Sequence, residues 1–379
     1  MSVNFRSGMK LYDNDWFMRY NWSVEQLTDY LAAHNITYVI AQSRFLPMDN
    51  SAVQSAISED DRRRYEALDD VVLRQMLRDR DIAYIAVQNI CFDPSYAAEH
   101  PEALPIDQHG ERMEQTDWYV GVPPIRQDNI RQKGQKLKEA VDALDPDGVH
   151  LGFIRWPGFW ETWLPGDQRG DKPEYCFAPQ TIEDFNRFAG LSLDPGLGHR
   201  NAPDLMQRYR AEWTRYKCEA TRAAIAELRG CFEVGKDPLT VSINTVPLFA
   251  DEFDGAVTEV YGQDWEMLKD VVDVFEVMAY HQICKRDARW PAEIAEHIKQ
   301  RSGQRAICTV QASALYLDGM HQEQKRSPTL DAHEFSRMLD ALESTDVDGL
   351  CIFTLTELMD RAQTKDGQMM LDRLSRFRL

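Results

Sequence analysis

Acidic residues stand just after short apolar runs of this sequence, where a folded chain would present them at the ends of its strands. Asp13 and Asp15 follow the run that ends near Tyr12, and Glu357 follows the run that ends at Thr354. Two carboxyl groups in different surroundings can act as the proton donor and the proton acceptor of one reaction. The arrangement indicates acid–base chemistry, with Asp13 as the acid or the base.

The group that works with Asp13 is left open between a carboxylic acid and a histidine. Glu357 is the acidic candidate, and the alternatives are His109, within residues 107–111, and His281, which follows an apolar run. An imidazole can give or take a proton because its pKa lies near neutrality. The candidate catalytic residues are therefore Asp13, His109, His281 and Glu357.

Polar and aromatic side chains gather at the ends of the same apolar runs. We expect the following residues to bind substrate: Asp15, Gln42, Arg44, Asn89, His150, Arg155, Trp156, Asn244, Tyr280 and Gln311. Trp16, Trp160 and Trp163 stand close by, and aromatic faces next to hydrogen-bonding groups suit the apolar faces and hydroxyl edges of sugar rings. The alternative is that these tryptophans and polar residues pack the rim of the fold.

Two arginines, Arg44 and Arg155, point to an anionic ligand. A guanidinium group is fork-shaped and pairs with a carboxylate, a sulfate or a phosphate through parallel hydrogen bonds. The two arginines would then hold an acidic sugar. The alternative places each of them in an ion pair with an acidic residue such as Asp13 or Asp15.

Apolar runs alternate with amphipathic stretches and predict the elements that position these residues. Strands are expected at residues 8–12, 38–42, 82–88, 148–154, 239–244, 274–280, 305–311 and 349–354, and the longest helices at 60–80, 127–144 and 205–229. Strand–helix units in this order predict an α/β fold, a (β/α)8 TIM barrel with long loops after strands 3 and 4. One catalytic domain is expected over residues 1–379, with its site at the carboxyl ends of the strands.

Glu276 stands inside the expected sixth strand. Side chains alternate along a strand, so Glu276 would face the barrel lumen together with Met278 and Tyr280. A carboxylate so deep in the fold needs a partner. We interpret Glu276 as a support for the site, and a catalytic acid of raised pKa is the alternative.

The expected fourth strand carries a motif. Residues 147–157 read DGVHLGFIRWP, which resembles the signature D-G-[IV]-x-[FL]-D-[YF]-I-R-[FYW]-P of glycosidase-like barrels. Residues 176–179, 262–265 and 277–281 are similar to segments of the same superfamily, and the likeness runs from about residue 8 to the end. The resemblance implies a glycoside hydrolase on a (β/α)8 barrel.

One position departs from that signature. Gly152 stands where the family has an acid, so this chain cannot use that carboxylate. His150 and Gly152 face the same side of the strand because the side-chain period is two. His150 could reach into the space that the missing side chain leaves, or it could be a hydrogen-bonded interior histidine.

A weaker likeness concerns the start of the chain. Asp13, just after the first expected strand, is similar to an Asp of barrel sialidases that invert the anomeric centre. That resemblance implies an Asp–His catalytic pair. It reaches only Asp13, because no histidine of this chain aligns with a motif.

Composition and charge limit which partners the protein can bind and which cell compartment we expect for it. The chain has 379 residues and a net charge of −19, which disfavours nucleic acid and anionic membranes as partners. Its cysteines are scattered, and no secretory leader or membrane span is recognised, so we expect a cytoplasmic protein. The expected partner is a small-molecule or oligosaccharide substrate, and a homodimer is left open.

These observations predict a glycosidase that cleaves a terminal acidic sugar of the sialic-acid or uronic-acid type. No cofactor and no metal are expected, since Asp13 and Asp15 form only an isolated DxD. One alternative is a sugar-acid lyase, epimerase or aldolase on the same barrel, for which Lys10 is the only strand lysine. The other is a carbohydrate-binding barrel without catalysis, which Gly152 favours.

Overall fold

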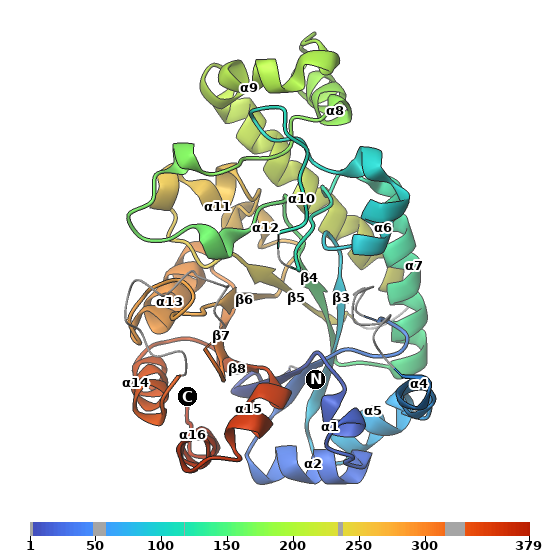
Figure 1. Ribbon diagram of the computed structural model, residues 1–379, viewed down its shortest axis with the longest axis vertical. Coiled ribbons are helices and arrows are strands. Elements are labelled where there is room, and N and C mark those ends of the chain that lie inside the picture. The colour runs from blue at the N-terminus through green and yellow to red at the C-terminus, as the bar shows by residue number, and fades with distance from the viewer. Residues whose placement is uncertain (1–2, 48–57, 117, 234–237, 315–329) are drawn as a thin grey trace.

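The chain folds into a closed barrel of parallel strands surrounded by helices (Figure 1). The computed structural model describes residues 3–47, 58–116, 118–233, 238–314 and 330–379. The strands are β1 (Ser7–Leu11), β2 (Tyr38–Ala41), β3 (Ala83–Asn89), β4 (Gly148–Gly152), β5 (Thr240–Thr245), β6 (Val274–Met278), β7 (Arg305–Gln311) and β8 (Gly349–Phe353). They pair in chain order and β8 closes on β1, which confirms the predicted (β/α)8 fold.

Helices connect the strands and cover the outside of the barrel. They are α1 (Asp15–Met18), α2 (Val24–Ala33), α4 (Glu59–Glu66), α5 (Asp70–Arg78), α6 (Pro94–Glu99), α7 (Gln127–Leu144), α8 (Pro179–Ala189), α9 (Gly198–Gln207), α10 (Arg210–Phe232), α11 (Ala256–Glu259), α12 (Trp265–Leu268), α13 (Trp290–Ser302), α14 (Ala332–Glu343), α15 (Leu355–Arg361) and α16 (Lys365–Ser375). Short 3-10 turns lie at Pro101–Ala103, Trp160–Thr162, Arg169–Asp171, Pro195–Leu197 and Glu252–Asp254. The long loops after β3 and β4 are present as predicted.

Two of the expected long helices are each divided in two. The stretch 60–80 breaks between α4 and α5, because the Asp69 carboxylate caps α5 by accepting the backbone N–H groups of Val71 and Val72. Such a cap starts a helix and leaves the preceding residues outside it. The stretch 205–229 spans the end of α9 and most of α10, which begins at Arg210.

Aromatic and aliphatic side chains fill the amino-terminal half of the lumen. Tyr38 lies against Gly8, where a side chain would come within 2.0 Å of the Tyr38 ring. The Tyr38 hydroxyl donates to the carbonyl of Leu350 at 2.9 Å. Around them pack Val3, Phe5, Ile40, Ile85, Val87, Val274, Ile307 and Cys351. This half of the lumen is a packed core, which leaves the carboxyl ends of the strands for a site.

Above this core, an ion pair crosses the lumen. Lys10 of β1 places Nζ 2.6 Å from Oε1 of Glu276 on β6, and both side chains are buried. Oε2 of Glu276 lies 3.1 Å from Nε2 of His150 and accepts a hydrogen bond of 3.1 Å from the Asn244 amide. Lys10 and these hydrogen bonds hold the pKa of Glu276 well below its usual range, although burial acts the other way.

His150 is a hydrogen-bonded interior histidine, the second of the two alternatives for it. Its Nδ1 lies 2.9 Å from the Ser242 hydroxyl, and its Nε2 faces Glu276. Burial lowers the pKa of His150, so the ring is neutral and donates Nε2–H to the carboxylate. The positive charge that balances Glu276 therefore comes from Lys10.

A second hydrophobic cluster lies outside the barrel, in the connection between β4 and α10. It contains Ile125, Trp156, Cys176, Phe177, Ile182, Phe185, Ala202, Leu205, Trp213 and Tyr216. Helices α8 and α9 project beyond α10 at the top of Figure 1. The long connection predicted after strand 4 therefore forms a separate packed layer.

We expect Lys10→Met to lower the free energy of unfolding by about 3–5 kcal/mol, because it leaves Glu276 charged and unpaired in the lumen. Adding Glu276→Leu should recover part of that loss. Lys138→Met is the control, since the Lys138–Asp142 pair on α7 is about half exposed and such pairs contribute only about 0.3–0.5 kcal/mol. Urea unfolding of wild type and the three variants measures this, and equal losses in Lys10→Met and Lys138→Met would contradict it.

Candidate active site

Two carboxyl groups meet at the carboxyl ends of β1 and β8. Asp13 follows β1, and its Oδ1 accepts hydrogen bonds from the Thr356 hydroxyl and, at 3.2 Å, from the backbone N–H of Asp15. Glu357 lies one residue beyond Thr356, in the first turn of α15. The structure therefore brings Asp13 together with Glu357, the acidic candidate for its catalytic partner.

Burial sets the protonation of both groups. It raises the pKa of Glu357 to about 8, and the negative charge of Asp13 adds to the effect. Burial also raises the pKa of Asp13, while the hydrogen bond from Thr356 favours its charged form. At neutral pH, Glu357 is mostly protonated and can donate a proton, whereas Asp13 is the better proton acceptor.

Aromatic rings line the mouth of the barrel next to this pair. The ring of Phe353 lies 5.9 Å from that of Tyr12 and 5.3 Å from that of Tyr280, and Tyr280 lies 6.0 Å from Trp160. Lys10 sits beneath them, with Nζ 4.7 Å from the centre of the Tyr12 ring. The mouth thus combines aromatic faces with charged groups, as sugar sites do.

Polar side chains from β3, β4 and β5 complete the lumen wall. A side chain on Gly152 would come within 2.5 Å of Oδ1 of Asn89, so Asn89 occupies the space where the resembling family has an acid. Asn244 uses both ends of its amide, since Oδ1 accepts the N–H of Phe153 at 2.7 Å and Nδ2 donates to Glu276. Asn89 and Asn244 therefore shape the wall at the β4 side.

Gln42 directly follows β2, and Gln311 ends β7 at the same rim. The Gln42 side chain hydrogen-bonds Tyr65. The Gln311 amide donates to the carbonyl of Ser313 at 2.6 Å, and its Oε1 has no hydrogen-bond partner among the described residues. An acceptor buried at the rim is available to a ligand hydroxyl.

A buried arginine and a buried acid follow β4. Arg155 is 1% exposed, and its guanidinium lies 5.0 Å from the ring centre of Phe153 and 5.9 Å from that of Tyr119. Its Nε and Nη1, like Oε2 of Glu161, make no hydrogen bond within the part of the chain that the structure describes. Burial raises the pKa of Glu161 to about 7, against the effect of Arg155. An uncompensated buried cation is unfavourable unless a ligand satisfies it.

The structure places the two candidate histidines away from Asp13. His109 is exposed in the loop after β3. His281 is buried at the end of β6, where its Nε2 lies 2.8 Å from Oε1 of Glu334, and Gln282 donates to the other oxygen of Glu334. Among the described residues, neither imidazole forms a hydrogen bond or ion pair with Asp13 or Glu357, so the geometry favours Glu357 as the partner of Asp13.

Three candidate substrate-binding residues are occupied by other contacts. Arg44 donates from Nε to Asp70 on α5 at 3.1 Å, so it pairs with an acid other than the two that the sequence analysis considered. Asp15 accepts from Arg19 at 3.1 Å. Trp156 is fully buried in the cluster beside α10 and donates its indole N–H to the carbonyl of Lys217. These contacts argue against direct substrate contacts for Arg44 and Trp156.

Three site residues were not found from the sequence. Glu161 lies in the Trp160–Thr162 3-10 turn, in a segment without a periodic pattern, and only its burial marks it. Lys10 was noted solely as a strand lysine, although its alternation with Gly8 and Tyr12 along β1 places it in the lumen. Phe353 ends β8, where the sequence analysis considered Thr354 and Glu357.

The described residues contain no group of three or more His, Cys, Asp or Glu that could hold a metal ion. Within the same residues, no helix has the length and apolar character needed to cross a membrane.

Comparison with known proteins gives the fold class. No family model matches the sequence, and no curated protein does either. The glycoside hydrolase domain of PgaB (BpsB) from Bordetella bronchiseptica has a similar structure, with a TM-score of 0.64 and 15% identity over 98% of this chain and 99% of that one. The catalytic domain of β-amylase from Paenibacillus polymyxa gives 0.58 at 10% identity over both whole chains.

A β-galactosidase from Bacillus circulans sp. alkalophilus gives a TM-score of 0.63 at 11% identity, over 99% of this chain and 56% of that one. At such identities the likeness shows the fold alone. The fold is the (β/α)8 barrel that these glycoside hydrolases share.

We expect the free energy of unfolding to fall as the pH rises from about 4.5 to about 8, because the folded state holds the Glu357 proton that the unfolded state releases. Glu357→Gln should flatten this fall, while Glu212→Gln, an exposed control on α10, should not. Melting temperatures of the three proteins between pH 4.5 and 9 test this. Parallel curves for wild type and Glu357→Gln would show that Glu357 has no raised pKa.

Proposed function

We propose that this protein is a glycoside hydrolase that releases a terminal acidic sugar by acid–base catalysis. The observation that carries the proposal is the pair of Asp13 and Glu357, two neighbouring carboxyl groups at the barrel mouth with different surroundings. Glycoside hydrolysis needs one carboxylic acid and one carboxylate on either side of the scissile bond. The shared fold of several glycoside hydrolases supports the same class.

In this reaction Glu357 protonates the leaving glycosidic oxygen, because its raised pKa keeps the proton at neutral pH. Asp13 then attacks the anomeric carbon or activates a water molecule. The rings of Tyr280 and Phe353 receive the apolar face of the sugar. Thr356 orients Asp13 through its hydroxyl.

Arg155 gives the preference for an acidic sugar. It is a buried cation whose Nε and Nη1 the described residues leave without a hydrogen-bond partner. Burial raises the pKa of its acidic neighbour Glu161 to about 7, so Glu161 is only partly charged at neutral pH. A carboxylate of a sialic or uronic acid would accept a charge-assisted hydrogen bond from one of these donors. Arg44, already bonded to Asp70, does not share this role.

We expect Asp13→Asn and Glu357→Gln each to lower kcat by a factor of about 10²–10⁴ on a fluorogenic glycoside panel that includes sialic-acid and uronic-acid substrates. In wild type, kcat/KM should fall as the pH rises through about 8, where Glu357 loses its proton, and also at low pH, where Asp13 gains one. Unchanged turnover in both variants would refute the assignment. Binding without turnover in wild type would favour the carbohydrate-binding alternative.

A second experiment tests the substrate class. Arg155→Lys and Arg155→Met should lower kcat/KM for acidic glycosides by about tenfold or more relative to matched neutral glycosides, because a charge-assisted hydrogen bond from a fixed guanidinium is lost. Arg44→Met is the matched control and should leave kcat/KM unchanged for both acidic and neutral glycosides. Melting temperatures show whether the Arg155 variants fold. An equal loss of kcat/KM on acidic and neutral substrates would mean that Arg155 supports the site without distinguishing charged from neutral substrates.

A further inference from the structure

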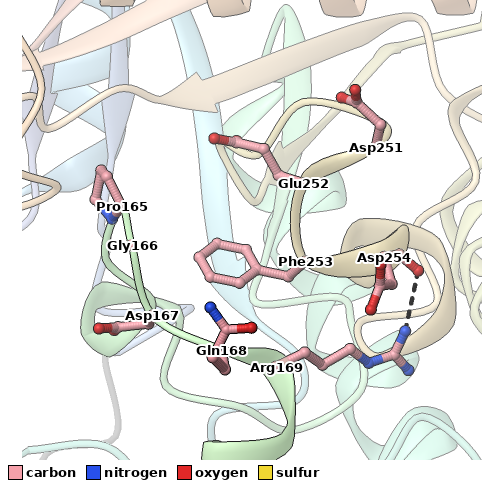
Figure 2. Close-up of a pocket in the computed structure, with 9 residues that line it drawn as sticks. All are labelled: Pro165, Gly166, Asp167, Gln168, Arg169, Asp251, Glu252, Phe253 and Asp254. Carbon is pink, nitrogen blue, oxygen red and sulfur yellow. Dashed lines mark hydrogen bonds between the residues drawn. The ribbon is translucent and has the colours of Figure 1, made fainter.

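A depression of about 310 Å³ lies on the rim, between the segment after the Trp160–Thr162 turn and the loop after β5. It is lined by Pro165, Gly166, Asp167, Gln168, Arg169, Asp251, Glu252, Phe253 and Asp254. Figure 2 shows the Phe253 ring between Glu252 and Gln168, facing Pro165 and Gly166. The depression thus has an aromatic face with polar groups on two sides of it.

The backbone of the β5 loop holds Phe253 in an unusual position. Phe253 has φ 49° and ψ 46°, and Asp254 follows with φ 54°. Left-handed backbone is sterically unfavourable for residues with a side chain, so two in succession need support from neighbouring contacts. This conformation directs a half-buried aromatic ring into the depression.

Ion pairs fix the two sides of the depression to each other. Arg169 binds Glu174 and Glu259 at 2.6 Å each and donates to the carbonyl of Asp254 at 3.0 Å, the bond drawn in Figure 2. On the other side, Glu252 accepts from Arg286. The ring of Phe253 is therefore held in place before any ligand arrives, which lowers the cost of binding.

The 3-10 turn after β4 connects the depression with the barrel mouth. Trp160, at its start, contacts Tyr280 at 6.0 Å between ring centres. Trp163, just after its end, contacts Phe253 at 5.2 Å, edge to face. One short turn therefore joins the mouth to the Phe253 side of the depression.

We propose that this depression is a second sugar-binding subsite, which holds a distal unit of an oligosaccharide whose terminal sugar lies at the mouth. The inference rests on the proposed function and adds that the substrate is a chain of sugars. The apolar face of a pyranose packs on Phe253, and its hydroxyl groups bond the Gln168 amide and the Glu252 carboxylate. A neutral unit fits best, because Glu252 and Arg169 already have charged partners.

The test compares fluorogenic single-sugar glycosides with oligosaccharides of increasing length that carry the same terminal sugar. In wild type, kcat/KM should rise with chain length. Phe253→Ala should lower kcat/KM for the longer oligosaccharides about tenfold by raising KM, because the stacking contact is lost. Gln168→Ala, at an exposed position that leaves the fold intact, should remove a smaller part. Phe188→Ala is the matched control, since Phe188 is exposed on α8 outside the depression.

Calorimetric binding of the same oligosaccharides to Glu357→Gln separates this inference from the proposed function. Hydrolysis with no dependence on chain length overturns the subsite and leaves the hydrolase standing. If no hydrolysis is seen but the oligosaccharide binds, and Phe253→Ala abolishes that binding, the subsite is supported and the hydrolase is overturned. An oligosaccharide that neither binds nor reacts overturns both.

Discussion

The ion pair between Lys10 and Glu276 is the constraint around which the inside of the barrel is organised. Two charges far from water are tolerated only when each finds its partner and the remaining lone pairs are satisfied. Here β4 and β5 supply that satisfaction through His150 and Asn244, so four strands contribute to one network. Because the network fixes these strands relative to one another, it also fixes the rim above it. Asn244 carries this link directly, since its other end holds the backbone where β4 leaves the barrel.

The same low-dielectric interior has opposite effects on carboxyl groups according to their partners. Glu276 has a cation within 2.6 Å and stays charged. Glu357 lies near another acid, and Glu161 has no ion pair among the described contacts, so burial pushes the pKa of both upward. One scaffold thus provides a negative charge deep inside and a mostly protonated acid, Glu357, at the mouth. This separation of roles is what acid–base chemistry at neutral pH requires.

The barrel and the position of its mouth could be predicted from the sequence, because alternation and strand ends are local properties. Asp13 and Glu357 were placed at strand ends in this way, and the structure brings them near each other. The partners of long polar side chains could not be predicted, because they come from distant elements: Asp70 on a helix occupies Arg44, and Glu334 near the start of α14 occupies His281. The surroundings of Trp156 could not be predicted for the same reason, since a separate layer over the β4 connection buries it. Whether a rim residue faces solvent or a neighbour is decided by tertiary packing alone.

The packed half of the lumen determines from which side a ligand can enter the barrel. Tyr38 and the apolar side chains around it block the amino-terminal end, so the barrel has a single entrance. A chain of sugars cannot thread through it, and the released unit must leave by the way the next one arrives. Ligand entry and exit would therefore share the carboxyl ends of the strands.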